Sequence, residues 1–136
     1  MPGRCLYVAE WIARPVAEVY EYSRDPAHLA LWVQGLGSSI ENVDGHWFMD
    51  SPGGRIEVSF AAENPYGVLD QQVTSSAGEV VHVPMRVIPD GDGCEIVFTV
   101  QRMPGMTDAE LARDAGLVAA DLATLKGLLE SVATPR

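Results

Sequence analysis

The feature that most constrains this fold is an amphipathic stretch at the end of the chain. Thr107 is followed three residues later by Glu110, the spacing of a capping box, in which each side chain accepts the other residue's backbone N–H. Apolar residues then recur at alternating steps of four and three on one face: Leu111, Ala115, Val118, Leu122, Leu125, Leu129 and Val132. The pattern predicts one helix over 107–132. At 1.5 Å per residue it is about 37 Å long, enough to cross a small sheet.

The residues before this helix predict short strands and little else. Residues 5–12 are rich in aromatic and β-branched types and predict a first strand. Two helix starts with proline at the first position predict short helices over 15–23 and 26–33. Turn residues then divide a period-two pattern into six antiparallel strands: 38–43, 46–51, 55–63, 67–75, 79–88 and 94–102. The length favours one α+β domain over 1–136.

Alternation of apolar and polar residues indicates which strand side chains face inward. Apolar residues occupy every second position in three of the expected strands: Ile56, Val58, Phe60, Val81, Val83, Met85, Val87, Ile96, Phe98 and Val100. In 67–75 the inward apolar positions are Leu69 and Val73, which places Gln71 inward between them. Burying an unpaired amide costs about 1–3 kcal/mol. We therefore expect Gln71 to make a polar contact inside the fold.

Charge and composition exclude two classes of partner. Nine basic residues against nineteen acidic ones give a formal net charge of −10. Binding to nucleic acid phosphates relies on clustered Lys and Arg, so no nucleic-acid partner is expected. No stretch approaches the ~20 apolar residues of a membrane span, and the chain does not start with a basic segment before an apolar run. These features predict a cytoplasmic protein without a membrane span.

Residues for catalysis and metal binding are sparse. Cys5 and Cys94 lie in no C-x-x-C pattern and no paired histidines supply ligands, so neither a metal nor another cofactor is predicted. His28, His46 and His82 fall on a short helix, beside a turn and at an outward strand position, and each is expected at the surface. There is no G-x-S-x-G motif and no phosphate-binding glycine loop. No catalytic residue is predicted.

Several segments resemble those of one known superfamily. The segment IARPVAEVYEYSRDPAHLALW carries the end of the first strand, a helix, Asp-Pro and a second helix ending in Trp. With the element order, it resembles the helix-grip superfamily of START lipid-transfer domains, the birch-pollen allergen, aromatic polyketide cyclases and bacterial SRPBCC proteins. The segments NPYGVLDQQV, VPMRV and PGMTDAELARDAGLVAADLATLKGLLE are similar to a bacterial SRPBCC subgroup described as polyketide cyclase-like. The resemblance implies a helix-grip fold: a seven-stranded curved antiparallel sheet, two short helices after the first strand and a long C-terminal helix.

The resemblance also implies a cavity between the inner face of the sheet and the long helix. Its expected lining comes from the sheet, both helical regions and the loop before the long helix: Trp32, Val58, Phe60, Gln71, Met85, Phe98, Met103, Met106, Val118 and Leu122. Such an apolar face is more often plain core. The same topology pairs the first and last strands antiparallel. Cys5 and Cys94 would then lie roughly 26 Å apart and stay unbonded.

Three functions follow from this interpretation. The leading one is binding of a small hydrophobic or aromatic molecule in the cavity, with Gln71 orienting it. The second is an enzyme of the polyketide cyclase or dehydratase type, which needs an inward-facing titratable group that alternation does not supply. The third is a protein-interaction domain of the co-chaperone type, with a cavity filled by its own side chains. The protein is expected to be a monomer or a weak homodimer through an exposed edge strand.

Overall fold

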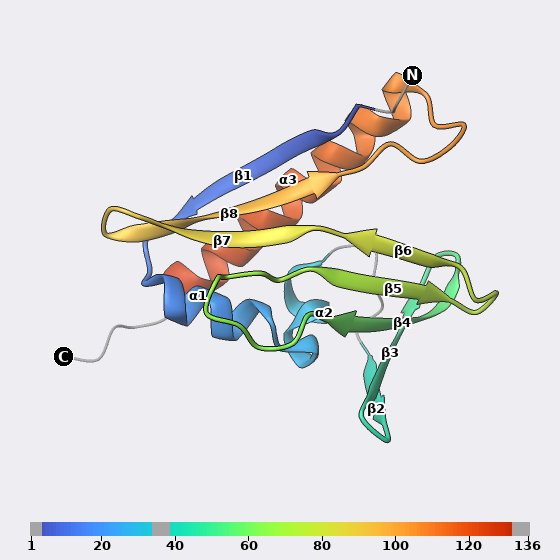
Figure 1. Cartoon of the computed structure of the whole chain (residues 1–136), viewed down its shortest axis with the longest axis horizontal. Helices are drawn as coiled ribbons and strands as arrows, with labels where there is room; N and C mark the ends of the chain where they lie inside the picture. The colour runs from blue at the N-terminus through green and yellow to red at the C-terminus, as the bar shows by residue number, and fades with distance from the viewer. Residues whose placement is uncertain (1–3, 34–38, 132–136) are drawn as a thin grey trace.

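A computed structural model describes residues 4–33 and 39–131, and its element order is the predicted one (Figure 1). A strand is followed by short helical segments, a meander of strands and one long helix. The elements are β1 (Leu6–Ile12), α1 (Val16–Ser23), the 3₁₀ turn η1 (Pro26–His28), α2 (Leu29–Trp32), β2 (Ile40–Val43), β3 (His46–Ser51), β4 (Gly54–Phe60), β5 (Gln71–Ser75), β6 (Val80–Val83), β7 (Met85–Asp90), β8 (Gly93–Val100) and α3 (Asp108–Glu130). Ser38 and Val132, which end two of the predicted elements, lie outside the described ranges.

The strands form two antiparallel sheets rather than the single seven-stranded sheet predicted from the sequence. One sheet has the order β1-β8-β7 and the other the order β2-β3-β4-β5-β6, so eight strands are present in the described chain. The predicted strand 79–88 is divided at Pro84 into β6, which pairs with β5, and β7, which pairs with β8. Proline has no N–H to donate to a ladder, so it permits the chain to leave one sheet and enter the other.

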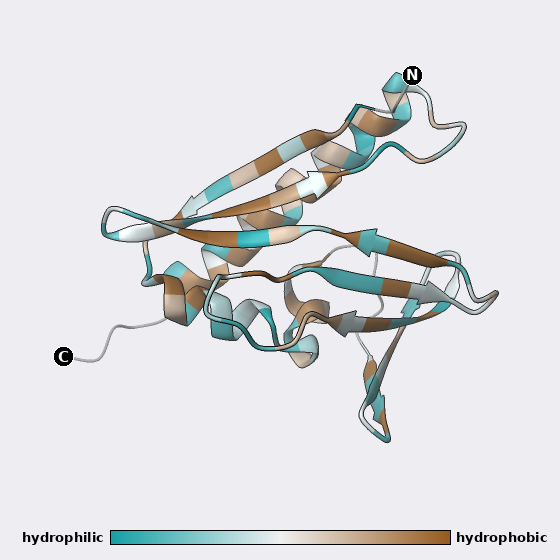
Figure 2. Cartoon of the chain, in the orientation of Figure 1, coloured by the Kyte–Doolittle hydropathy of each residue, from teal (hydrophilic) through white to brown (hydrophobic). Residues whose placement is uncertain are grey.

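The first and last strands pair antiparallel as predicted. Leu6 lies opposite Val100, and Ile12 lies opposite Cys94. The two cysteines therefore lie at opposite ends of the pair, and both are free thiols. Burial raises the pKa of the Cys94 thiol, which keeps it protonated. β8, the central strand of this sheet, is hydrophobic along most of its length (Figure 2).

Helix α3 closes the fold, as its sequence pattern predicts. Thr107 Oγ1 accepts the Glu110 N–H at 3.1 Å, and Glu110 Oε1 accepts the Thr107 N–H at 2.9 Å, which completes the capping box. The helix packs against β1, β8 and α2. The helix residues buried in this contact come from the predicted apolar face: Leu111, Leu122, Leu125 and Leu129. No helix in the described ranges is both long and apolar enough to cross a membrane.

The C-terminal end of α3 is bonded to the junction between β1 and α1. Glu130 Oε2 accepts the Ala13 N–H at 2.8 Å and the Lys126 ammonium at 2.7 Å. Lys126 Nζ also donates to the Trp11 carbonyl at 2.8 Å, and Arg14 Nε donates to the Leu129 carbonyl at 3.0 Å. The hydrogen bond from Lys126, followed by that from Ala13, lowers the pKa of the Glu130 carboxyl.

The capping box gives a first testable prediction. Thr107→Ala removes the acceptor for the Glu110 N–H and should lower the free energy of unfolding by about 1 kcal/mol. The measurement is urea denaturation followed by circular dichroism. Thr124→Ala is the matched control, because this threonine lies inside α3 and its hydroxyl bonds back to the Ala120 carbonyl. A loss of stability as large in Thr124→Ala as in Thr107→Ala would contradict the assignment.

The Glu130 contacts predict an acid-dependent loss of stability. A carboxyl whose pKa is lowered by folding stabilises the protein above its ordinary pKa of 4.5, and that contribution disappears as the pH falls through the folded value. Glu130→Gln should therefore be less stable than the parent at pH 7, with a difference that shrinks below pH 4.5. Thermal unfolding across this pH range tests it, with exposed Glu79→Gln as the control. A pH-independent difference would show that the Glu130 charge is not involved.

Candidate functional site

An apolar cavity lies between the five-stranded sheet and α3. It has a volume of about 230 Å³. We call it the inner cavity, and its lining residues come from β4, β5, β6, β8, α3 and the α2 region: Leu29, Trp32, Val33, Ile56, Val58, Gln71, Val73, Val83, Phe98, Val118, Asp121 and Leu122. The cavity therefore forms where the sheet curves around the helix, as the sequence resemblance implies.

Gln71 is the polar strand residue on the cavity wall. It lies opposite Phe60 of β4 and Val83 of β6, and it is 7% exposed. Within the described ranges its side-chain amide makes no hydrogen bond. The sequence predicted a polar contact for this residue inside the protein, and the chain itself does not provide one. The buried amide therefore has donor and acceptor capacity that a molecule in the cavity can satisfy.

Trp32 forms the wall on the α2 side and is 2% exposed. Its Nε1 is buried and has no hydrogen-bond partner among the residues described. The preceding turn holds α2 in place, because Asp25 Oδ1 accepts the Ala27 N–H at 3.0 Å and the His28 ring stacks on Tyr22 with centroids 4.0 Å apart. Burial, with a contribution from Asp25, raises the pKa of Tyr22.

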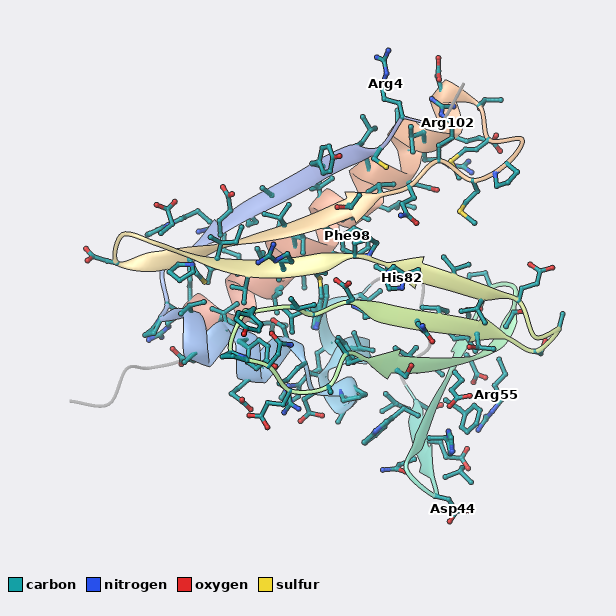
Figure 3. All side chains as sticks on the ribbon, viewed as in Figure 1. Arg4, Asp44, Arg55, His82, Phe98 and Arg102 are labelled. Carbon is teal, nitrogen blue, oxygen red and sulfur yellow. The ribbon has the colours of Figure 1, made fainter. Side chains whose placement is uncertain are left out.

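A second space adjoins the inner cavity beyond Val83, Phe98 and Val118, which line both. We call it the outer groove. Its volume is about 300 Å³ and it is more open to solvent. It lies where β6 separates from β8, and α3 forms its other wall: Val81, His82, Val83, Phe98, Thr99, Val100, Gln101, Met103, Met106, Asp114, Leu117 and Val118. Phe98 of β8 and His82 of β6 mark the two sides of this separation in Figure 3.

The ten predicted site residues do not form one site in the structure but lie at four separate locations. Those on the inner cavity are Trp32, Val58, Gln71, Phe98, Val118 and Leu122. Met103 and Met106 line the outer groove instead. Phe60 lies in a separate surface hollow with Asp70 and His82. Met85 is 1% exposed and belongs to the core, because β7 packs against α1 rather than facing the cavity.

Sequence reasoning missed half of the cavity lining. The unassigned residues are Leu29, Val33, Ile56, Val73, Val83 and Asp121. Alternation places Ile56, Val73 and Val83 inward but does not assign them to the cavity. Asp121 carries a carboxylate to the cavity wall, although it precedes the buried Leu122 in the helix. Asp121 and Asp114 are seven residues apart, which puts both on one side of α3. This spacing is the sequence feature that could have identified Asp121.

The histidines occupy exposed or partly exposed positions. His82, with a side chain that is 51% exposed, has Nε2 at 3.4 Å from Asp70 Oδ2. Asp70 Oδ1 accepts the Met85 N–H at 3.0 Å, so this carboxylate is held at the crossing between the sheets. His46 Nδ1 lies 2.6 Å from Glu57 Oε2 at the surface. No group of three or more His, Cys, Asp or Glu side chains within residues 4–33 and 39–131 has a metal-binding arrangement.

Comparison with known proteins identifies the fold. No family model matches the chain, and no curated protein matches it. Among solved structures, DynU16 of the dynemicin biosynthetic locus superposes with a TM-score of 0.69 at 19% identity, over 96% of this chain and 48% of that one. The chain thus spans about half the length of DynU16. Ara h 8.0201 gives 0.69 at 14% identity, over 95% of this chain and 99% of that one.

The Aha1 dimer from Colwellia psychrerythraea gives a TM-score of 0.73 at 16% identity, over 94% of this chain and 97% of that one. These proteins share the helix-grip architecture of the SRPBCC and birch-pollen-allergen-like folds. The resemblance inferred from the sequence is therefore confirmed at the level of the fold. At such identities the likeness defines architecture, and function has to be argued from the site.

The unpartnered amide of Gln71 predicts a stabilising substitution. Gln71→Leu replaces a buried polar group by an apolar one of similar size and should raise the free energy of unfolding of the empty protein by about 1 kcal/mol. Gln72→Leu, the exposed neighbour on β5, is the matched control and should change it by less than about 0.5 kcal/mol. Denaturant unfolding measures both. Destabilisation by Gln71→Leu would mean that the amide has a partner in the folded chain.

Proposed function

We propose that this protein binds a small hydrophobic or aromatic molecule in the inner cavity. The observation that carries the proposal is the buried Trp32 Nε1, which has no hydrogen-bond partner in the described chain, on a mostly apolar wall that Gln71 shares. Ligand pockets combine apolar walls with a few polar groups that fix orientation, and this cavity has that composition.

The volume of the inner cavity limits the size of its ligand. At about 230 Å³ it exceeds the ~150 Å³ of an apolar protein cavity that binds benzene, and it is smaller than the ~300 Å³ of common drug-sized pockets. One or two fused rings would fit, whereas a long acyl chain would have to extend into the outer groove. The co-chaperone-like alternative stays a further candidate, because the inner cavity is smaller than the ~300 Å³ of a common ligand pocket.

An enzyme of the cyclase or dehydratase type is the second candidate. Its requirement was a titratable group facing the cavity, and Asp121 supplies a carboxylate there. Carrier and enzyme differ in what happens to the bound molecule. If a co-purified compound is recovered unchanged after prolonged incubation with fresh protein, it supports the binding role. Loss of one water from that compound, abolished in Asp121→Asn, supports the enzyme.

Occupancy of the cavity can be tested directly with 2-naphthol as a neutral bicyclic probe. Val118→Phe enlarges a side chain on the cavity wall and should weaken 2-naphthol binding by about tenfold or more in calorimetry. Val73→Phe narrows the cavity from the opposite wall and should act similarly. Ala119→Phe, at an exposed position of the same helix, is the matched control.

Native mass spectrometry of freshly purified protein provides an independent readout, because a co-purified molecule should leave Val118→Phe but remain in Ala119→Phe. Circular dichroism establishes that each variant is folded. If parent and Val118→Phe bind 2-naphthol equally, or the folded parent does not bind it, the inner cavity is not the binding site.

A further inference from the structure

We propose that the ligand is an aromatic amine, with its ring in the inner cavity and its ammonium group in the outer groove beside Asp114. This inference rests on the proposed binding function and adds the ligand's shape and charge. It depends on three features of the structure: the contact between the two spaces, the charges on their walls and the spacing of residues along α3.

The two spaces adjoin at three shared residues: Val83, Phe98 and Val118. Before Pro84, β6 pairs with β5, and after it β7 pairs with β8; the Thr99 N–H donates to the Pro84 carbonyl at 3.0 Å at this division. The outer groove occupies this separation. A ligand whose ring fills the inner cavity can therefore extend past the Phe98 side chain without entering the hydrogen-bonded ladders.

The walls of both spaces favour a cation over an anion. Neither lining, within the residues described, contains a lysine or an arginine, whereas Asp114 lines the outer groove. His82 also lines the groove, but it lies 3.4 Å from Asp70, so the pair carries no net positive charge whether or not the imidazole is protonated. Asp121 has an electrostatic or hydrogen-bonding interaction of its own, so the argument rests on Asp114.

Two cations that adjoin the groove residues in sequence, Arg102 and Arg113, interact with other groups. Arg102 NH1 donates to the Met106 carbonyl at 2.9 Å, and its NH2 is paired with Asp108. Arg113 lies near Glu110 and contributes to lowering the pKa of that carboxyl. Arg4 and Arg55 lie far from Phe98 at the periphery of the molecule (Figure 3). None of these cations lines the groove beside Asp114, and the protein's net charge of −10 also favours a cationic ligand.

Helix α3 sets the distance between ring and charge. Asp114, Val118 and Leu122 are spaced by four residues and share one face of the helix. Asp114 lines the outer groove, Val118 lines both spaces, and Leu122 lines the inner cavity. A rise of 1.5 Å per residue puts Asp114 about 6 Å along the axis from Val118. A chain of about four carbons between ring and nitrogen spans that distance.

The test compares three probes of matched length that differ in charge at pH 7. They are 4-(2-naphthyl)butylamine, which is a cation, 4-(2-naphthyl)butan-1-ol, which is neutral, and 4-(2-naphthyl)butanoate, which is an anion. The amine should bind about fivefold tighter than the alcohol, as expected for a partly exposed charge pair, and the butanoate should bind weakest. Asp114→Asn should remove the advantage of the amine and leave the affinity for the alcohol unchanged.

The matched control is Asp92→Asn, which changes the net charge equally at an exposed turn position between β7 and β8. It should leave the binding of all three probes unchanged. The charge assignment would be overturned if amine and alcohol bound equally, or if Asp114→Asn and Asp92→Asn lost amine binding equally. In either case, binding of the alcohol would still support the proposed function. If folded protein binds none of the probes, both proposals fail.

Discussion

The packing of α3 against β1 and β8 is the contact on which the rest of the structure depends. Buried leucines fix the helix on the three-stranded sheet, and bonds from Lys126, Glu130 and Arg14 attach its end to the β1–α1 junction. With the helix held there, the five-stranded sheet does not pack directly on it but faces it across the inner cavity. The inner cavity is the space left between that second sheet and the helix.

Periodicity, turn residues and capping were sufficient to predict α3 and the element order, because these depend on local sequence. The β1–β8 pairing came from the resemblance to a known architecture. The division of residues 79–88 was missed because alternation continues through Pro84, although its missing N–H was a signal for the break. The cavity lining was less predictable. Alternation placed Met85 inward correctly but could not show that α1 covers that part of the sheet, and Asp121 depends on how α3 is rotated.

Buried polar groups distinguish this cavity from an ordinary core. Gln71 and Trp32 both line it with hydrogen-bonding capacity that the described chain leaves unused. An apolar residue at position 71 would give a more stable empty protein, so the glutamine is explained more readily by recognition than by folding. In the proposed function, a bound molecule would make the polar contact that the sequence leads us to expect for Gln71.

Pro84 has a mechanical consequence for the molecule. Each sheet is internally cross-linked by its own ladders, yet β6 and β8 face each other with no ladder between them. The sheets are joined at one end of this line, where the Thr99 N–H donates to the Pro84 carbonyl and the backbone of residues 67–69 bonds to β7. Beyond that junction, only side-chain packing opposes a separation of β6 from β8. A ligand somewhat larger than the inner cavity would therefore have to displace packed side chains between β6 and β8, but no strand pairing.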